Sequence, residues 1–132
     1  METVESINMI MSKEPGSDVL FVKYKENCFI DLESAKIDLE TRLKFQDGKP
    51  YYVLAEIVHL RNASKEAREF LSKVDGGLQG IKAGAFVSGS VFSYSILNLF
   101  LRINRPLVPS RFFSNTKAAL EWFDELRNNE NQ

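Results

Sequence analysis

Residues 81–87 read Ile-Lys-Ala-Gly-Ala-Phe-Val, and this run decides the fold class of the chain. It is almost wholly apolar, as is Tyr-Tyr-Val-Leu-Ala-Glu-Ile at residues 51–57, which is typical of strands buried on both faces of a sheet. Between them an amphipathic helix is predicted to open at Asn62 or Ser64, with an apolar stripe of Ala63, Ala67, Phe70, Leu71 and Val74. A strand, a helix and a second buried strand indicate a parallel pair joined by a crossover helix.

The chain before this unit adds further elements of the same kind. Residues 19–24 are β-branched and aromatic and predict a strand, and residues 28–30 are expected to return beside it as a short hairpin strand. Residues 3–11 form a mixed apolar run, for which we prefer an edge strand to a flexible leader. Asp31 is expected to cap a helix with an apolar stripe of Leu32, Ala35, Leu39 and Leu43.

The chain after residue 87 is marked by an uncharged stretch at residues 83–101. A membrane-spanning helix needs about 20 consecutive apolar residues. Ser88, Gly89 and Ser90 interrupt this stretch, so we expect a buried strand followed by a helix, and no transmembrane segment. A short strand at residues 110–113 and a last helix capped within residues 114–116 follow.

These elements predict one α/β domain with a mixed central sheet of about five strands and four helices. We expect the domain to span residues 18–127. Residues 1–17 are then an N-terminal leader or edge strand, and residues 128–132 a frayed tail.

Composition excludes several classes of protein. The 132 residues carry a formal net charge of −1, whereas a nucleic-acid-binding protein would need a basic face, so we expect no nucleic-acid partner. Cys28 is the only cysteine and His59 the only histidine, so neither a disulfide nor the usual zinc ligand set can form, and we expect no metal and no cofactor. The N-terminus is acidic where a signal peptide is basic, which favours a cytoplasmic location.

The second half of the chain carries a resemblance to a known family. The strand at residues 81–87 is followed by a helix that ends in Leu-Phe-Leu-Arg-Ile, and residues 111–122 read Arg-Phe-Phe-Ser-Asn-Thr-Lys-Ala-Ala-Leu-Glu-Trp. This pattern resembles STAS domains, and most closely the SpoIIAA-like group, which is sometimes placed with small lipid-binding domains of the Sec14 type. The resemblance covers residues 18–127. It implies a STAS-like fold and a non-catalytic regulatory or ligand-binding module.

The resemblance also implies a place for a regulatory phosphoserine. STAS antagonists carry one just after the third strand, in an Asp-Ser-Ser-Gly-like setting at the start of a helix. Ser64 falls at the matching place, where the Asp, the second Ser and the Gly are absent.

The expected sheet itself predicts where a ligand would lie. Ligands of open α/β sheets collect beyond the carboxyl ends of the parallel strands, where helix N-termini present free N–H groups. The candidate ligand-binding residues at these ends are Asn62, Ser64, Ser88, Gly89, Ser90, Ser114 and Asn115. The alternative is that these residues only cap helices, a role for which Ser and Asn are preferred. Glu56 and His59 follow one of the strands, and we expect them at the solvent-facing strand end rather than in a catalytic pair.

The helix expected at residues 91–103 has a wider apolar face than one contact with the sheet covers. Tyr94, Leu97 and Leu101 form a second apolar shoulder beside its main stripe. We expect a neighbouring helix, a second subunit in a homodimer, or a lipid to cover it.

Taken together, these features of the sequence favour a non-enzymatic module that binds a regulatory protein or a small ligand. The alternative is a protein that binds lipid or apolar ligands, or associates peripherally with the membrane surface, through this helix.

Overall fold

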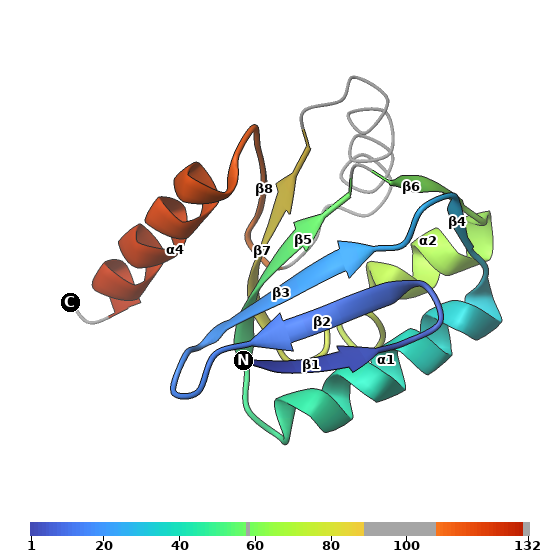
Figure 1. The fold of residues 1–132 in the computed structure, drawn as a ribbon, viewed down its shortest axis with the longest axis horizontal. Helices are drawn as coiled ribbons and strands as arrows, with labels where there is room; N and C mark the ends of the chain where they lie inside the picture. Colours follow the sequence, from blue (N-terminus) through green and yellow to red (C-terminus); the bar gives the residue numbers. More distant parts are fainter. Residues whose placement is uncertain (58, 89–107, 131–132) are drawn as a thin grey trace.

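The computed structural model describes residues 1–57, 59–88 and 108–130 (Figure 1). The elements in chain order are β1 (Glu2–Glu5), β2 (Met9–Lys13), β3 (Val19–Tyr24), β4 (Cys28–Ile30), α1 (Leu32–Gln46), β5 (Tyr51–Glu56), β6 (Leu60–Ala63), α2 (Lys65–Leu71), β7 (Ile81–Val87), β8 (Ser110–Phe113) and α4 (Thr116–Glu130). The helix expected at residues 91–103 lies outside the described residues.

Six strands form the main sheet, in the order β1-β2-β3-β5-β7-β8. The pairs β3–β5, β5–β7 and β7–β8 are parallel, whereas β1 and β2 are antiparallel to their neighbours. The predicted mixed α/β sheet is confirmed, with six strands rather than about five. The described residues contain a further two-stranded pair, β4–β6, and three helices.

The N-terminal residues do lie at the edge of the sheet, as preferred over a flexible leader, but two details of the N-terminal half differ from the expectation. Residues 1–13 form two paired strands rather than one, because the chain reverses at Ser6, whose N–H donates to the Met9 carbonyl at 2.8 Å. Strand β4 does not return along β3 as a hairpin; it pairs in parallel with β6. The reason is that β2 and β5 already occupy both edges of β3, which leaves no hydrogen-bonding edge for β4.

Helix ends also differ from the expected ones. Helix α2 ends at Leu71, so Val74 lies beyond it and is 54% exposed instead of completing the apolar stripe. Helix α4 runs on through Glu130, past the expected end of the domain at residue 127.

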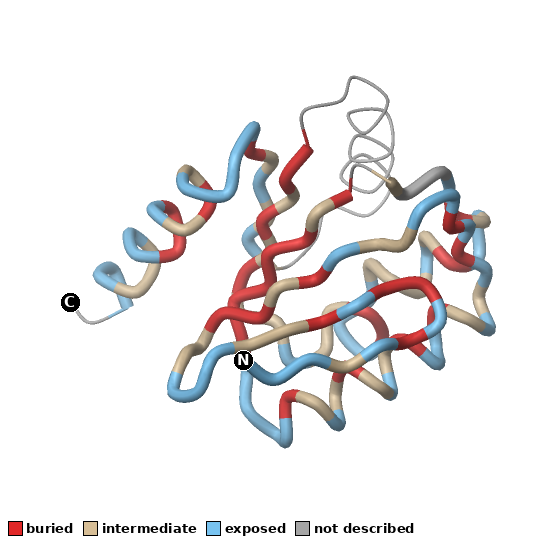
Figure 2. Tube along the Cα trace, viewed as in Figure 1, coloured by how far each residue is buried: buried red, intermediate tan, exposed pale blue. Residues whose placement is uncertain are grey.

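The sheet separates two apolar cores, and burial concentrates on its central strands (Figure 2). Strand β5 contributes side chains to both cores, because successive side chains of a strand point to opposite faces of the sheet. Tyr51, Val53 and Ala55 pack in the core under α1 and α2, whereas Tyr52 and Leu54 pack in the core under α4.

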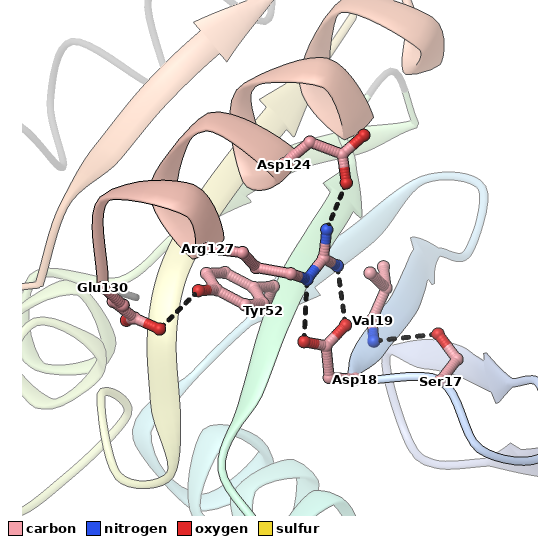
Figure 3. A network of polar contacts seen from close by, with 7 residues as sticks. All are labelled: Ser17, Asp18, Val19, Tyr52, Asp124, Arg127 and Glu130. Carbon is pink, nitrogen blue, oxygen red and sulfur yellow. Dashed lines mark hydrogen bonds and ion pairs between the residues drawn. The ribbon is translucent and has the colours of Figure 1, made fainter. Parts of the chain in front are cut away.

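Polar contacts fix the C-terminal end of α4 to the sheet (Figure 3). Arg127 donates to both carboxylate oxygens of Asp18, which immediately precedes β3. The Tyr52 hydroxyl lies 3.1 Å from a Glu130 carboxylate oxygen, and the Arg127 guanidinium lies 4.9 Å from the centre of the Tyr52 ring. These contacts join the C-terminal turns of α4 to β5 and to the start of β3.

Candidate functional site

A cavity of about 140 Å³ lies between the main sheet and the two helices α1 and α2. The sheet contributes mainly apolar side chains, and the helices contribute both apolar and charged ones. Its described lining comprises Met9, Val22, Tyr24, Ile30, Ala35, Asp38, Leu39, Arg42, Val53, Ala55, Ile57, Leu71, Ser72, Gly77, Leu78, Ile81, Gly84, Ala85, Phe86, Val108 and Ser110.

The face that α1 buries is largely polar. Asp38, Arg42 and Gln46 recur every four residues, and each is at most 5% exposed. The predicted stripe on this helix is only partly buried: Ala35 is buried, and Leu32, Leu39 and Leu43 are half-buried, with Leu39 in the cavity wall. The four-residue spacing was a signal that these polar residues share one helix face, but charged residues are expected to face solvent.

Asp38 binds the turn between β1 and β2. Its carboxylate accepts the Ser6 hydroxyl at 2.6 Å, the Asn8 side-chain amide at 2.8 Å and the Asn8 backbone N–H at 3.3 Å. The Asp38 carboxylate, which is almost fully buried, therefore accepts three hydrogen bonds. Proteins bury a charged group at tolerable cost only when it is hydrogen-bonded in this way. This contact fixes the N-terminal hairpin over α1.

Arg42 and Gln46 bind the loop between α2 and β7. Arg42 donates to the Gln46 side-chain oxygen at 2.5 Å and to the Gly77 carbonyl at 2.9 Å. Gln46 donates in turn to the carbonyls of Lys49 and Gly80, both at 3.0 Å. Burial lowers the pKa of Arg42 to about 10, so the side chain remains charged at neutral pH.

Tyr24 reaches the cavity from the end of β3, near both of these charged residues. Burial is the main reason that its pKa is raised above the usual range; the charge of Asp38 adds to the effect and that of Arg42 opposes it. The hydroxyl therefore stays protonated at neutral pH. Tyr24, Asp38 and Arg42 form the polar part of an otherwise apolar cavity.

The predicted ligand residues lie at two places. Asn62 is in β6, and its side-chain oxygen accepts the N–H of Ala63 at 2.8 Å. Ser64 is the N-cap of α2, because its hydroxyl accepts the Ala67 N–H at 3.1 Å. Both residues belong to the β4–β6 pair and its connection to α2, not to the end of a strand in the main sheet.

The other predicted residues follow β7 and β8. Ser88 is buried, and its N–H donates to the Phe113 carbonyl at 3.3 Å, which places it beside Ser114. Asn115 caps α4 by accepting the Ala118 N–H at 2.9 Å. The structure thus brings Ser88 near Ser114 and Asn115. Gly89, Ser90, Tyr94, Leu97 and Leu101 lie outside the described residues.

The remaining reactive side chains are dispersed. Glu56 is half-buried at the end of β5, opposite Lys23 in the parallel register, and His59 is half-buried in the connection to β6. Cys28 is 8% exposed, and burial is the main reason that the pKa of its thiol is raised to about 11. Within residues 1–57, 59–88 and 108–130, no group of three or more His, Cys, Asp or Glu side chains is placed to hold a metal ion.

The arrangement of sheet and helices is that of a SpoIIAA-like domain. It is similar to the crystal structure of an uncharacterized DUF3478-family protein with a SpoIIAA-like fold from Shewanella loihica PV-4, with a TM-score of 0.59 and 17% sequence identity over 92% of this chain and 97% of that chain. The predicted likeness is therefore confirmed for the fold. By sequence, the chain belongs to DUF7793, a domain family of unknown function whose profile matches residues 12–127. No curated protein matches the chain. None of the described helices is both long and apolar enough to span a membrane.

Proposed function

We propose that this protein is a non-catalytic STAS-like binding module that takes a small, mainly apolar ligand into the cavity between the sheet and helices α1 and α2. The observation that carries the proposal is the cavity itself. Its volume is about 140 Å³, close to that of an engineered apolar cavity of ~150 Å³ that stays dry and binds benzene. Val22, Val53, Leu39 and Phe86 supply apolar surface to such a ligand.

The polar groups around the cavity support binding rather than catalysis. A general acid or base works best when its pKa lies near the working pH. Tyr24 has a raised pKa and stays neutral, whereas Arg42 stays charged. The Ser72 hydroxyl already donates to the main chain of α2, to the carbonyls of Arg68 and Glu69. These groups are suited to holding a ligand in one orientation.

Gly84 lines the cavity and offers a direct test, because a side chain introduced at this position would extend into the cavity. Among the described atoms, the nearest to a Cβ placed on Gly84 is the Ser110 hydroxyl oxygen, at 3.8 Å, so a larger residue would extend into empty space. We expect benzyl alcohol to shift the amide NMR signals of Val53, Ala55 and Phe86 saturably. In Gly84→Val the affinity should fall at least ~tenfold, because the added side chain occupies the cavity.

Gly84→Ala is the matched control, because it adds one methyl group and should weaken binding less. Absence of saturable shifts in the wild-type protein, or equal affinity in Gly84→Val, contradicts the proposal. Native mass spectrometry of protein purified from cells tests the same idea without an added probe, since a bound small molecule should appear as a mass increment that Gly84→Val loses.

The other predicted modes of action remain predictions. Binding of a protein partner, of a second copy of the chain or of a membrane surface was expected at residues 91–103, outside the described residues. Phosphorylation of Ser64 would act on a hydroxyl that now accepts the Ala67 N–H. Mass spectrometry of protein from cells would detect the phosphate.

A further inference from the structure

The cavity wall contains a buried guanidinium, that of Arg42, which forms no ion pair with the described residues. Arg42 is 5% exposed, and in the described part of the chain no carboxylate lies within 4.0 Å of its guanidinium. Its acceptors are neutral, namely the Gln46 amide oxygen and the Gly77 carbonyl. A guanidinium has five N–H donors, so these two bonds leave donors for a further acceptor. A buried cation without a counter-ion favours the entry of an anion.

Asp38, the other charged residue of the wall, is in a different position. Its carboxylate oxygens already accept the Ser6 hydroxyl and two N–H groups of Asn8. Its negative charge is therefore stabilised by donors from the β1–β2 turn, whereas the acceptors that the described residues offer to Arg42 are the neutral oxygens of Gln46 and Gly77. The two residues lie one helical turn apart, so the polar end of the cavity is asymmetric and its unbalanced charge is positive.

The apolar part of the wall determines the rest of the ligand. Val53, Ala55 and Phe86 on the sheet face Leu39 and Leu71 on the helices, and they offer contact to a hydrocarbon body. The volume of about 140 Å³ limits that body to roughly the size of one benzene ring. A planar carboxylate matches the donor pattern of a guanidinium, with which it forms paired hydrogen bonds.

We propose that the cavity binds a small organic carboxylate with an apolar body of about one ring, and that Arg42 is the counter-ion of the carboxylate. This inference rests on the proposed function, because it names the class of ligand that the cavity takes. The carboxylate would lie against the guanidinium of Arg42, and the hydrocarbon part would lie against Val53 and Phe86.

Three probes of similar size and different charge test the inference on the wild-type protein: benzoate, benzyl alcohol and benzylamine. NMR titration at pH 7 should give an affinity for benzoate at least ~tenfold above that for benzyl alcohol, as expected for a charge-assisted hydrogen bond, with benzylamine weakest. If benzyl alcohol binds and benzoate binds no more tightly, the inference fails while the proposed function stands. If benzylamine binds most tightly, Asp38 and not Arg42 selects the ligand. If no probe binds, both proposals fail.

Substitution of Arg42 tests whether this residue causes the preference for benzoate over benzyl alcohol. Arg42→Gln should reduce the affinity for benzoate to that for benzyl alcohol, because it removes the charge and the guanidinium donors. The affinity for benzyl alcohol should stay within about twofold, because Gln keeps the side chain up to Cδ and a polar amide. Unchanged benzoate binding in this variant would overturn the assignment. Arg42→Lys keeps the charge if the glutamine variant does not fold, and should retain a preference for benzoate over benzyl alcohol. Arg127→Gln, on the opposite face of the sheet, is the control that should bind benzoate as the wild type does.

Discussion

Arg127 binds Asp18 at two points: its Nε lies 2.8 Å from one carboxylate oxygen, and its Nη2 lies 2.6 Å from the other. This pair joins the C-terminal part of α4 to the residue before β3. Asp18→Asn should lower the free energy of unfolding by about 0.5–1 kcal/mol, because the pair is partly exposed to solvent and screened by it. Urea denaturation followed by far-ultraviolet circular dichroism measures the change.

Asp124 provides the matched control for this pair. It contacts the same guanidinium from one turn earlier in α4, but its side chain is 70% exposed, against 40% for Asp18. Asp124→Asn should therefore destabilise the protein less than Asp18→Asn. The opposite order would mean that the contact with Asp18 does not hold α4 on the sheet.

The Asp18 pair also predicts how stability depends on pH. Hydrogen bonding from Arg127 is the main reason that the pKa of Asp18 lies below its ordinary value of 3.8. A carboxyl group with a lowered pKa in the folded state stabilises the protein fully above its unfolded pKa, and this contribution is lost as the pH falls through the folded value. The difference between wild type and Asp18→Asn should be full at pH 6 and shrink as the pH falls below 4. A difference of the same size at pH 6 and pH 3 would contradict this account.

Asp38 and Asp31 allow two aspartates of one helix to be compared. Asp38→Ala removes the acceptor of the Ser6 hydroxyl and of both N–H groups of Asn8, and should cost about 2–4 kcal/mol. Asp31 is exposed and caps α1 by accepting the Ser34 N–H, so Asp31→Ala should cost about 1 kcal/mol. Chemical denaturation of both variants checks the order. Equal losses would show that the buried network contributes no more than a helix cap.

Gly80 tests the contact between Gln46 and the loop that precedes β7. Its φ is +72°, and a Cβ on it would lie 2.8 Å from the Gln46 side-chain nitrogen, so Gly80→Ala should combine backbone strain with displacement of Gln46. Gly48 has a φ of +75° with nothing within 4 Å, so Gly48→Ala measures the strain alone. We expect Gly80→Ala to cost about 1 kcal/mol more than Gly48→Ala, the value of one hydrogen bond. If the two variants lose equal stability, Gln46 does not constrain the loop.

The apolar strands were predictable from the sequence because their composition alone signals burial. Residues 51–57 and 81–87 gave the central parallel pair, and β8 was predicted with the bounds Ser110–Phe113 that the structure shows. The partner of β4 was not predictable in the same way, since pairing depends on which edges of β3 are already occupied. The short connection between residues 24 and 28, which favoured a hairpin, carries no information about those edges.

The cavity was harder to anticipate than the strands. Its polar residues lie on α1 among Glu and Lys residues that face solvent, and a sequence pattern does not distinguish a buried Arg42 from an exposed one. Asp38 and Arg42 are buried because two segments that are distant in the chain, the β1–β2 turn and the loop at Gly77, pack against them. The candidate residues at helix starts, by contrast, were selected by a local preference, and Ser64 and Asn115 are indeed helix caps.

Trp122, the only tryptophan, has a consequence for how the protein can be studied. It packs against Phe113 and Phe123 in the core under α4, and the sheet separates it from the cavity. Its fluorescence should therefore report the docking of α4 and should not change when a small molecule occupies the cavity. Emission from Trp122 and amide signals from the cavity wall would then follow two different events, the docking of α4 and the occupancy of the cavity, without an attached fluorescent dye.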